Sequence, residues 1–253
     1  MQMLATLILV AAIVVGCAAP RSAPANTPPT ARMTFVYLIT GPSSATNTRE
    51  HKSEIFKGHM ANMQNLADEG KLLIAGPFAK PRDPAWRGVF IFDVPTAAQA
   101  RELAASDPGV IAGEFATIIR EIEIPASVRA MPDLEKHMQA ELKAQGTADR
   151  KPGDPPQGIR PYVMLHTTDL LRARAALAPS ANAPTTATPP RAPAPRIIWW
   201  ARFTDTPEEG IIVLDATSVD DARKAIDGLD AGACDLDGWY STASLVRMTA
   251  ESK

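Results

Sequence analysis

Apolar and polar positions alternate with two different periods along the first half of the chain. Four segments are rich in β-branched, aromatic or other apolar residues or alternate apolar with polar positions, which is typical of strands. They are residues 34–41, 71–78, 87–94 and 114–124. Two further segments are predicted to be helices. Residues 50–69 have Phe56, Met60, Met63 and Leu66 at helical spacing, with His59 at the edge of this apolar stripe, and stop at Gly70. Residues 96–106 are the second helix, for which Thr96 is a good N-cap. This order of elements, β-α-β-β-α-β, predicts an α+β fold of the ferredoxin-like type.

The same order of elements returns in the second half of the chain. Residues 88–103 align without gaps on residues 210–225, a shift of 122 positions. Four residues recur at this shift, in the pairs Gly88 and Gly210, Asp93 and Asp215, Ala100 and Ala222, and Arg101 and Arg223. We predict two tandem ferredoxin-like units, 34–125 and 161–247, packed as an intramolecular pseudo-dimer of the dimeric α+β barrel type. The alternative to a duplication is the patterning that any two such units share.

The segments around these units are polar or rich in proline. Residues 18–33 contain Pro, Ala, Ser and Thr without apolar periodicity, so we expect a tether. Residues 126–160 are predicted as a polar linker that holds a short amphipathic helix near 133–145. In the second unit the first helix is short and continues into a Pro-rich loop at 178–196.

The first 17 residues are an apolar run that is short for a membrane span and ends at Cys17. The residues Val14-Val15-Gly16-Cys17 resemble a bacterial lipobox, which implies cleavage before Cys17 and attachment of diacylglycerol to its thiol. The protein would then be anchored by lipid in the cell envelope, facing the periplasm or the outside. No Lys or Arg precedes the run. An uncleaved anchor and a signal peptide cut elsewhere are therefore the alternatives.

Charge and cysteine content restrict the partners. The formal net charge of -2 argues against nucleic acid, which favours a basic face. If Cys17 is acylated, Cys234 is the only free thiol and no intramolecular disulfide forms. No Cys or His cluster has zinc spacing, and neither a haem ligand nor a phosphate loop is indicated. We therefore expect neither a metal nor a cofactor.

Two stretches of the first unit carry motifs of a known family: FKGHMANMQNLADEGKLLIAGPF (56–78) and ASDPGVIAGEF (105–115). With FVYLITGP and RGVFIFDV they resemble the YCII-related (YciI-like) domain over about residues 34–125. The resemblance implies a ferredoxin-like fold that pairs into a dimeric α+β barrel, with a functional His and Asp at the pocket. By motif these are His59 and Asp107. Most members have no assigned reaction, and some eliminate halide from chlorinated aromatic compounds, which needs a base.

The residue types of His59 and Asp107 suit that role. A carboxylate bonded to one ring nitrogen of a histidine fixes its tautomer and leaves the other nitrogen free to accept a proton. Each residue also has a structural alternative. A histidine on a helix flank is commonly a hydrogen-bonded structural residue, and Asp-Pro-Gly is turn chemistry that would close the second helix.

Four more residues are predicted to bind a small-molecule substrate: Gly76, Pro77, Phe78 and Arg87. The missing side chain of Gly76 would let a ligand approach, and Arg87 would bind an anionic group. Strand termination and a solvated edge are the alternatives. In the second unit Leu229 matches Asp107, and His166 lies on the first strand, so no histidine matches His59. One intact and one inactive pocket are therefore expected.

The sequence thus supports two functions of different classes. The first is a lipoprotein enzyme in which His59 acts as a general base in an isomerisation or elimination. The second is a non-catalytic envelope lipoprotein that binds a small ligand or another protein. In both cases the second unit would replace a partner subunit, so the protein would be a monomer.

Overall fold

The computed structural model describes residues 28–80, 82–146, 156–178, 195–226, 229 and 232–248. Residues 1–27 and nearly all of the Pro-rich loop lie outside the described residues. The signal peptide, the tether and the lipid on Cys17 therefore remain predictions. In the part of the chain that is described, no helix is both long enough and apolar enough to cross a membrane.

The elements follow the predicted order in each half of the chain. The first half contains β1 (Thr30–Thr40), α1 (Arg49–Asp68), β2 (Leu72–Pro77), β3 (Trp86–Phe92), α2 (Ala97–Ala105), the short α3 (Pro108–Ile111) and β4 (Phe115–Pro125). The 3-10 helix η1 (Ala126–Ala130) and α4 (Met131–Gln145) follow. The second half contains β5 (Ile159–Thr167), α5 (Leu170–Leu177), β6 (Ile197–Phe203), β7 (Gly210–Leu214), α6 (Val219–Ala225), β8 (Cys234–Thr242) and α7 (Leu245–Met248).

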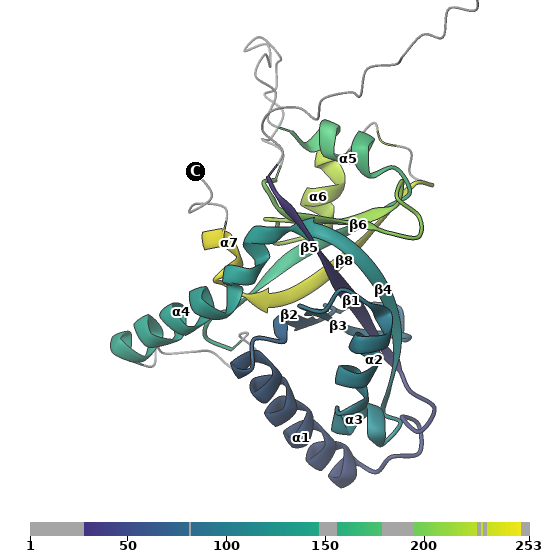
Figure 1. The fold of residues 1–253 in the computed structure, drawn as a ribbon, viewed down its shortest axis with the longest axis vertical. Helices are drawn as coiled ribbons and strands as arrows, with labels where there is room; N and C mark the ends of the chain where they lie inside the picture. Colours follow the sequence, from purple (N-terminus) through teal and green to yellow (C-terminus); the bar gives the residue numbers. More distant parts are fainter. Residues whose placement is uncertain are drawn as a thin grey trace, which may run out of the picture.

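All eight strands form one antiparallel sheet in the order β2-β3-β1-β4-β6-β7-β5-β8. β4 of the first half pairs with β6 of the second half through Ile122 and Glu123. The two ends of the sheet also meet, because Phe78 forms a bridge with Trp239 and Ala79 N donates to Gly238 O at 2.7 Å. The sheet is therefore a nearly closed barrel (Figure 1), which confirms the predicted α+β class and its barrel arrangement.

Helices cover the outside of the barrel on two sides. α1 and α2 pack on the outer face of the first-half strands, over a core that includes Val36, Leu66, Phe90 and Phe92. α5 and α6 cover the second-half strands in the same way. Figure 1 shows these two helical groups at opposite ends of the view. The outer apolar residues alternate along each strand with the residues that fill the barrel.

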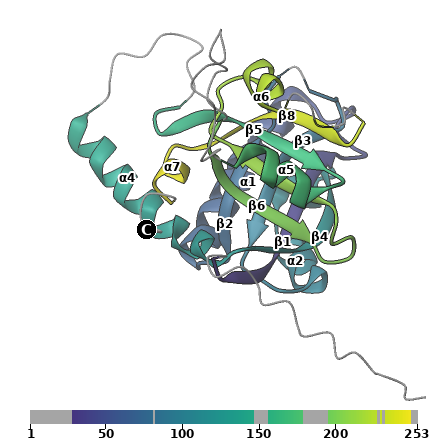
Figure 2. The same cartoon turned by 90° about the horizontal axis from the view of Figure 1, so that it is seen from above.

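Part of the segment 126–160, which was expected to be a polar linker, packs against the core of the barrel. η1, α4 and α7 contact one another at one end of the barrel, and Figure 2 shows α4 and α7 on the same side of it. They contribute Val128, Met131, Leu134, Leu245 and Met248 to the core of the barrel interior. Met131, Leu134 and Met138 recur at helical spacing, so one side of α4 is apolar and is buried. This end of the barrel is thus closed by an apolar plug.

The orientation of α1 differs from the sequence-based expectation. Its buried residues are Ile55, His59 and Leu66, whereas Phe56 and Met60 are exposed. The predicted apolar stripe contained Phe56 and Met60, with His59 at its edge. The neighbouring stripe is buried, since α1 packs against both the sheet and α3, and Pro108 of α3 lies next to Gly58. His59 is consequently turned toward the sheet.

Candidate functional site

His59 and Asp107 come together although 48 positions separate them in the chain. His59 lies on the buried side of α1, and Nδ1 of its ring is 2.7 Å from Oδ2 of Asp107. Asp107 is the N-cap of α3, and its Oδ1 accepts a hydrogen bond from Gly109 N at 2.7 Å. Asp107 therefore begins a helix rather than closing α2, and this cap orients the carboxylate toward α1.

The hydrogen-bond pattern determines which nitrogen of His59 is free. An ionised carboxylate only accepts hydrogen bonds, so Nδ1 of His59 must donate to Asp107. Nε2 then has a lone pair and no hydrogen. Among the described residues Nε2 makes no hydrogen bond, and this nitrogen keeps some contact with solvent. Nε2 is therefore the atom that can accept a proton from a bound molecule.

Aromatic rings enclose the imidazole of His59. The ring centroids of Phe56, Phe90 and Phe115 lie 6.1, 5.8 and 5.2 Å from it. Only 9% of the His59 side chain is accessible to solvent. A molecule that reaches Nε2 would therefore contact aromatic surface, which favours a planar or apolar body.

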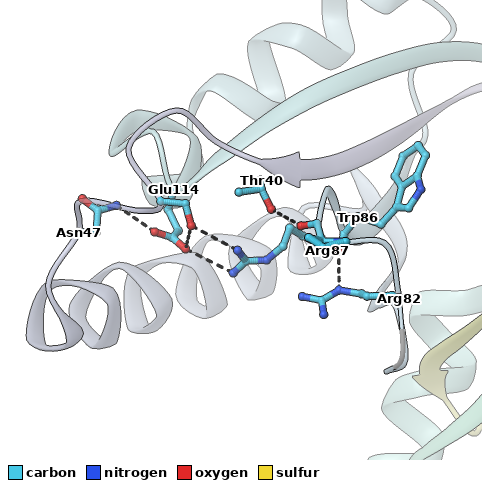
Figure 3. Close-up of polar contacts among 8 residues, drawn as sticks. Thr40, Asn47, Arg82, Trp86, Arg87 and Glu114 are labelled. Atoms are coloured by element: carbon cyan, nitrogen blue, oxygen red, sulfur yellow. Dashed lines mark hydrogen bonds and ion pairs between the residues drawn. The ribbon is translucent and has the colours of Figure 1, made fainter.

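A second ion pair lies beside this site. Glu114 directly precedes β4 and accepts hydrogen bonds from Ser44 Oγ at 2.8 Å and Asn47 Nδ2 at 2.9 Å. Arg87 Nη2 lies 3.3 Å from Glu114 Oε1 (Figure 3). Arg87 Cζ lies 5.1 Å from the ring centroid of Phe115. Phe115 therefore packs against both Arg87 and His59. The guanidinium uses only part of its donors on Glu114 and Ser44.

The environment of Glu114 keeps it charged. Burial by itself opposes ionisation, but hydrogen bonds from Asn47 and Ser44 and the charges of Lys52 and Arg87 together lower the pKa of Glu114 below its usual 4.5. Glu114 was not among the predicted site residues, although it stands in the stretch ASDPGVIAGEF. No local pattern marks it, because Ser44 and Asn47 come from a loop about 70 positions earlier.

The remaining predicted binding residues lie elsewhere. Gly76 is at the seam between β2 and β8, where Trp239 Nε1 donates to its carbonyl oxygen at 3.0 Å. Phe78 is buried in the barrel interior, and Pro77 is exposed. The structure thus brings together His59, Asp107 and, across one ring, Arg87, but places the segment 76–78 at the seam.

A comparison with protein families found a match in the first half of the chain. Residues 33–123 match the model of the YCII-related domain. The predicted family and its extent are therefore confirmed for the first half, and His59, Asp107 and Arg87 all lie inside the YCII-related domain. A comparison with curated proteins gave no match.

Two solved structures are distantly similar. The first is 5-chloro-2-hydroxyhydroquinone dehydrochlorinase from Burkholderia phenoliruptrix AC1100 in complex with 2,5-dihydroxybenzoquinone. It is 20% identical, with a TM-score of 0.27, and the match covers 34% of this chain and 89% of that one. The second is the crystal structure of a protein from Lactobacillus acidophilus NCFM whose suggested function is that of a monooxygenase. It is 13% identical, with a TM-score of 0.41, and the match covers 83% of this chain and 93% of that one.

The half of the chain that follows the YCII-related domain has a small hollow of its own. It is lined by Thr167, Asp169, Arg172, Ala173, Leu229, Ala233 and Cys234. It has room for about one water molecule. Leu229 stands at the position that matches Asp107 in the shifted alignment, and α5 contains no histidine. The hollow therefore lacks the pair found beside the YCII-related sheet.

The described residues also limit the chemistry of metals and thiols. In the ranges that the structure describes, no group of three or more His, Cys, Asp or Glu side chains is arranged to hold a metal ion. Cys234 is a free, buried cysteine, and its Sγ lies 3.7 Å from Thr167 Oγ1. Its burial restricts access by reagents and partners.

Proposed function

We propose that the YCII-related domain binds a small molecule beside His59 and that His59 Nε2 removes a proton from it. One observation carries the proposal: the 2.7 Å hydrogen bond between His59 Nδ1 and Asp107 Oδ2, with the second oxygen of Asp107 held by Gly109 N. This pairing fixes the tautomer in which Nε2 is the base. It also stabilises the imidazolium that forms when Nε2 takes the proton.

The reaction class follows from what the site supplies. Nε2 of His59 accepts a proton from carbon, and the electrons of the broken C–H bond form a double bond. In an elimination a leaving group departs with its own electron pair, and in an isomerisation the proton returns at another carbon. The spare donors of Arg87 would stabilise negative charge that develops on the bound molecule.

Isotope exchange tests this proposal without knowledge of the natural substrate. The full chain would be incubated in D₂O with a panel of small acids, lactones and substituted hydroquinones, and deuterium incorporation at carbon would be followed by NMR. We expect exchange on at least one compound and a loss of about 10²–10⁴-fold in His59→Gln. Exchange that is unchanged in His59→Gln would overturn the assignment of the base.

A non-catalytic ligand-binding role is the second candidate. It is favoured by the enclosure of His59, whose side chain is 9% accessible between aromatic rings. In that case members of the panel would bind to the wild type and to His59→Gln with similar Kd, and neither protein would promote exchange. Binding and exchange measured on the same samples separate the two functions.

The two halves are proposed to be duplicated ferredoxin-like units that pack as a pseudo-dimer in one chain. The support is the repeated order of elements and the meeting of β4 with β6 and of β2 with β8. We expect sedimentation of the chain from residue 28 onward, which keeps all of β1, to give the mass of a monomer. An obligate dimer would contradict the pseudo-dimer.

The N-terminal segment is proposed to anchor the protein in the cell envelope through a lipid on Cys17. The support is the apolar run that ends in Val-Val-Gly-Cys. Mass spectrometry of the membrane fraction should find a diacylglyceryl mass on an N-terminal Cys17 peptide. Cys17→Ser should abolish this mass and release the protein from the membrane, and a membrane-bound Cys17→Ser protein would contradict the lipid anchor.

A further inference from the structure

The two ends of the barrel differ. One end is filled by the apolar plug of η1, α4 and α7. At the other end, side chains that point into the barrel remain accessible to solvent. Ile118 of β4 is 43% exposed, and the side chains of His166 and Asp237 are 23% and 27% accessible. We call this the open end of the barrel, because a small ligand in solution can reach these side chains.

Strand alternation establishes that these residues point inward. Tyr162 and Met164 belong to the core of the barrel interior, and His166 continues the alternation along β5. Trp239 is in the same core, and Asp237 stands two positions before it on β8. The open end is therefore lined by polar side chains inside a barrel whose other end is apolar.

A hydrogen bond spans the open end. Tyr37 Oη on β1 lies 3.2 Å from Nδ1 of His166 on β5, and these strands are four places apart in the order of eight. Trp86 packs against Tyr37 with ring centroids 5.0 Å apart and against Phe78 at 5.8 Å. Tyr37, Trp86 and Phe78 thus make an aromatic wall beside the imidazole.

The charges at this end are unbalanced. Nε2 of His166 lies 3.7 Å from Oδ2 of Asp237, but burial lowers the pKa of His166 to about 4, so the ring is neutral near pH 7. Burial and the nearby carboxylates of Asp235 and Asp83 raise the pKa of Asp237. Among the described residues, the ion pairs of Asp237 include no Lys or Arg.

Arg120, an inward-facing cation that acts electrostatically on Tyr37, already has partners of its own. Arg120 on β4 donates to Asp205 Oδ1 at 2.7 Å and to Thr206 Oγ1 at 2.8 Å. Its guanidinium also lies 3.9 Å from the ring centroid of Phe203. A cation from outside the chain would therefore find aromatic faces and an uncompensated carboxylate together.

We propose that the open end of the barrel is a second binding site, for a small organic ammonium ion with an aromatic or apolar body. The ammonium group would lie at the rim beside Asp237 and Trp86, where a carboxylate and an aromatic ring both attract positive charge. His166 and Tyr37 would accept or donate hydrogen bonds at the same place. The apolar body would contact Ile118 and the wall.

This site is separate from the site at His59. Trp86 and Arg87 are consecutive, yet in Figure 3 their side chains point in different directions. Trp86 packs against the barrel interior, and Arg87 pairs with Glu114. The start of β3 therefore supplies one residue to each site. Binding at the open end does not depend on the proposed chemistry of His59.

Calorimetry on the full chain with three matched probes tests the proposal. The probes are 2-phenylethylamine, 2-phenylethanol and 3-phenylpropionate, which share a body and differ in charge. We expect the amine to bind at least about tenfold more tightly than the other two, and Asp237→Asn to weaken amine binding about tenfold. Asp220→Asn, an exposed carboxylate on α6, and His59→Gln should leave amine binding unchanged.

Three results would overturn the proposal. One is amine binding no tighter than that of the alcohol or the acid. Another is amine binding that Asp237→Asn leaves intact in a protein with wild-type near-UV circular dichroism. The third is loss of amine binding in His59→Gln, which would move the ligand to the other site. An unfolded Asp237→Asn protein would be replaced by Trp86→Leu, for which the same loss is expected.

Discussion

Trp239 Nε1 donates a hydrogen bond to the carbonyl oxygen of Gly76 over 3.0 Å, and this contact joins the last strand of the sheet to the first. Ser241 Oγ donates to Ala75 O at 2.8 Å along the same seam. The barrel is thus closed here by side-chain hydrogen bonds and an isolated bridge. The missing side chain of Gly76 thus lets β8, rather than a ligand, approach β2 closely.

Replacing Gly76 by alanine should destabilise the protein by about 3 kcal/mol, because overpacking against backbone is costly. A Cβ atom at Gly76 would lie 1.9 Å from Tyr240 O, which cannot move without opening the seam. The control is Gly70→Ala, which has φ of +70° and open space, and should cost about 1 kcal/mol. Urea denaturation measures both, and equal losses would contradict the steric argument.

Replacing Glu114 by glutamine should cost about 1–3 kcal/mol at neutral pH, because Arg87 then lacks its buried partner. The pKa of Glu114 is lowered in the folded state, so its stabilisation is present above the usual value of 4.5 and is lost as the pH falls below it. The free energy of unfolding of the wild type and of Glu114→Gln should therefore converge in acid. A constant difference between pH 7 and pH 3 would contradict this linkage.

His166 should make stability depend on pH in a higher range. Its pKa is about 4 in the folded protein against 6.5 when unperturbed, so the unfolded chain takes up the proton first as the pH falls. The free energy of unfolding should fall by up to about 1.4 kcal/mol per pH unit as the pH decreases from 6.5 to 4. Urea titrations of the wild type and His166→Gln would show this slope in the wild type alone. Parallel pH curves would count against it.

The tautomer of His59 should depend on Asp107. In the wild type the hydrogen is on Nδ1, because the carboxylate can only accept it. In Asp107→Asn the side-chain oxygen can still cap α3, but the amide can donate to Nδ1 and move the hydrogen to Nε2. Nitrogen-15 NMR of the imidazole should report this exchange of roles, at a cost in stability of about 1 kcal/mol. An unchanged nitrogen spectrum would refute the proposed pairing.

The elements of the first half could be predicted because their periods are local. Thr96 was expected to cap the second helix, and its side chain accepts from Gln99 N. The strands agree with their predicted ranges to within a few residues. The family resemblance also named His59 and Asp107 as partners, and the structure places them 2.7 Å apart. Whether the pair is catalytic stays a prediction.

The sequence by itself determined the order of the elements, the family of the first half and the residue types that could form a base. These are encoded within short stretches, where helix and strand periods and caps act over a few positions. Only the tertiary structure decided which side of α1 is buried, that Glu114 pairs with Arg87, and that Tyr37 meets His166. These contacts join positions 27 to 129 residues apart. They depend on how the closed sheet superimposes its strands, which no local period contains.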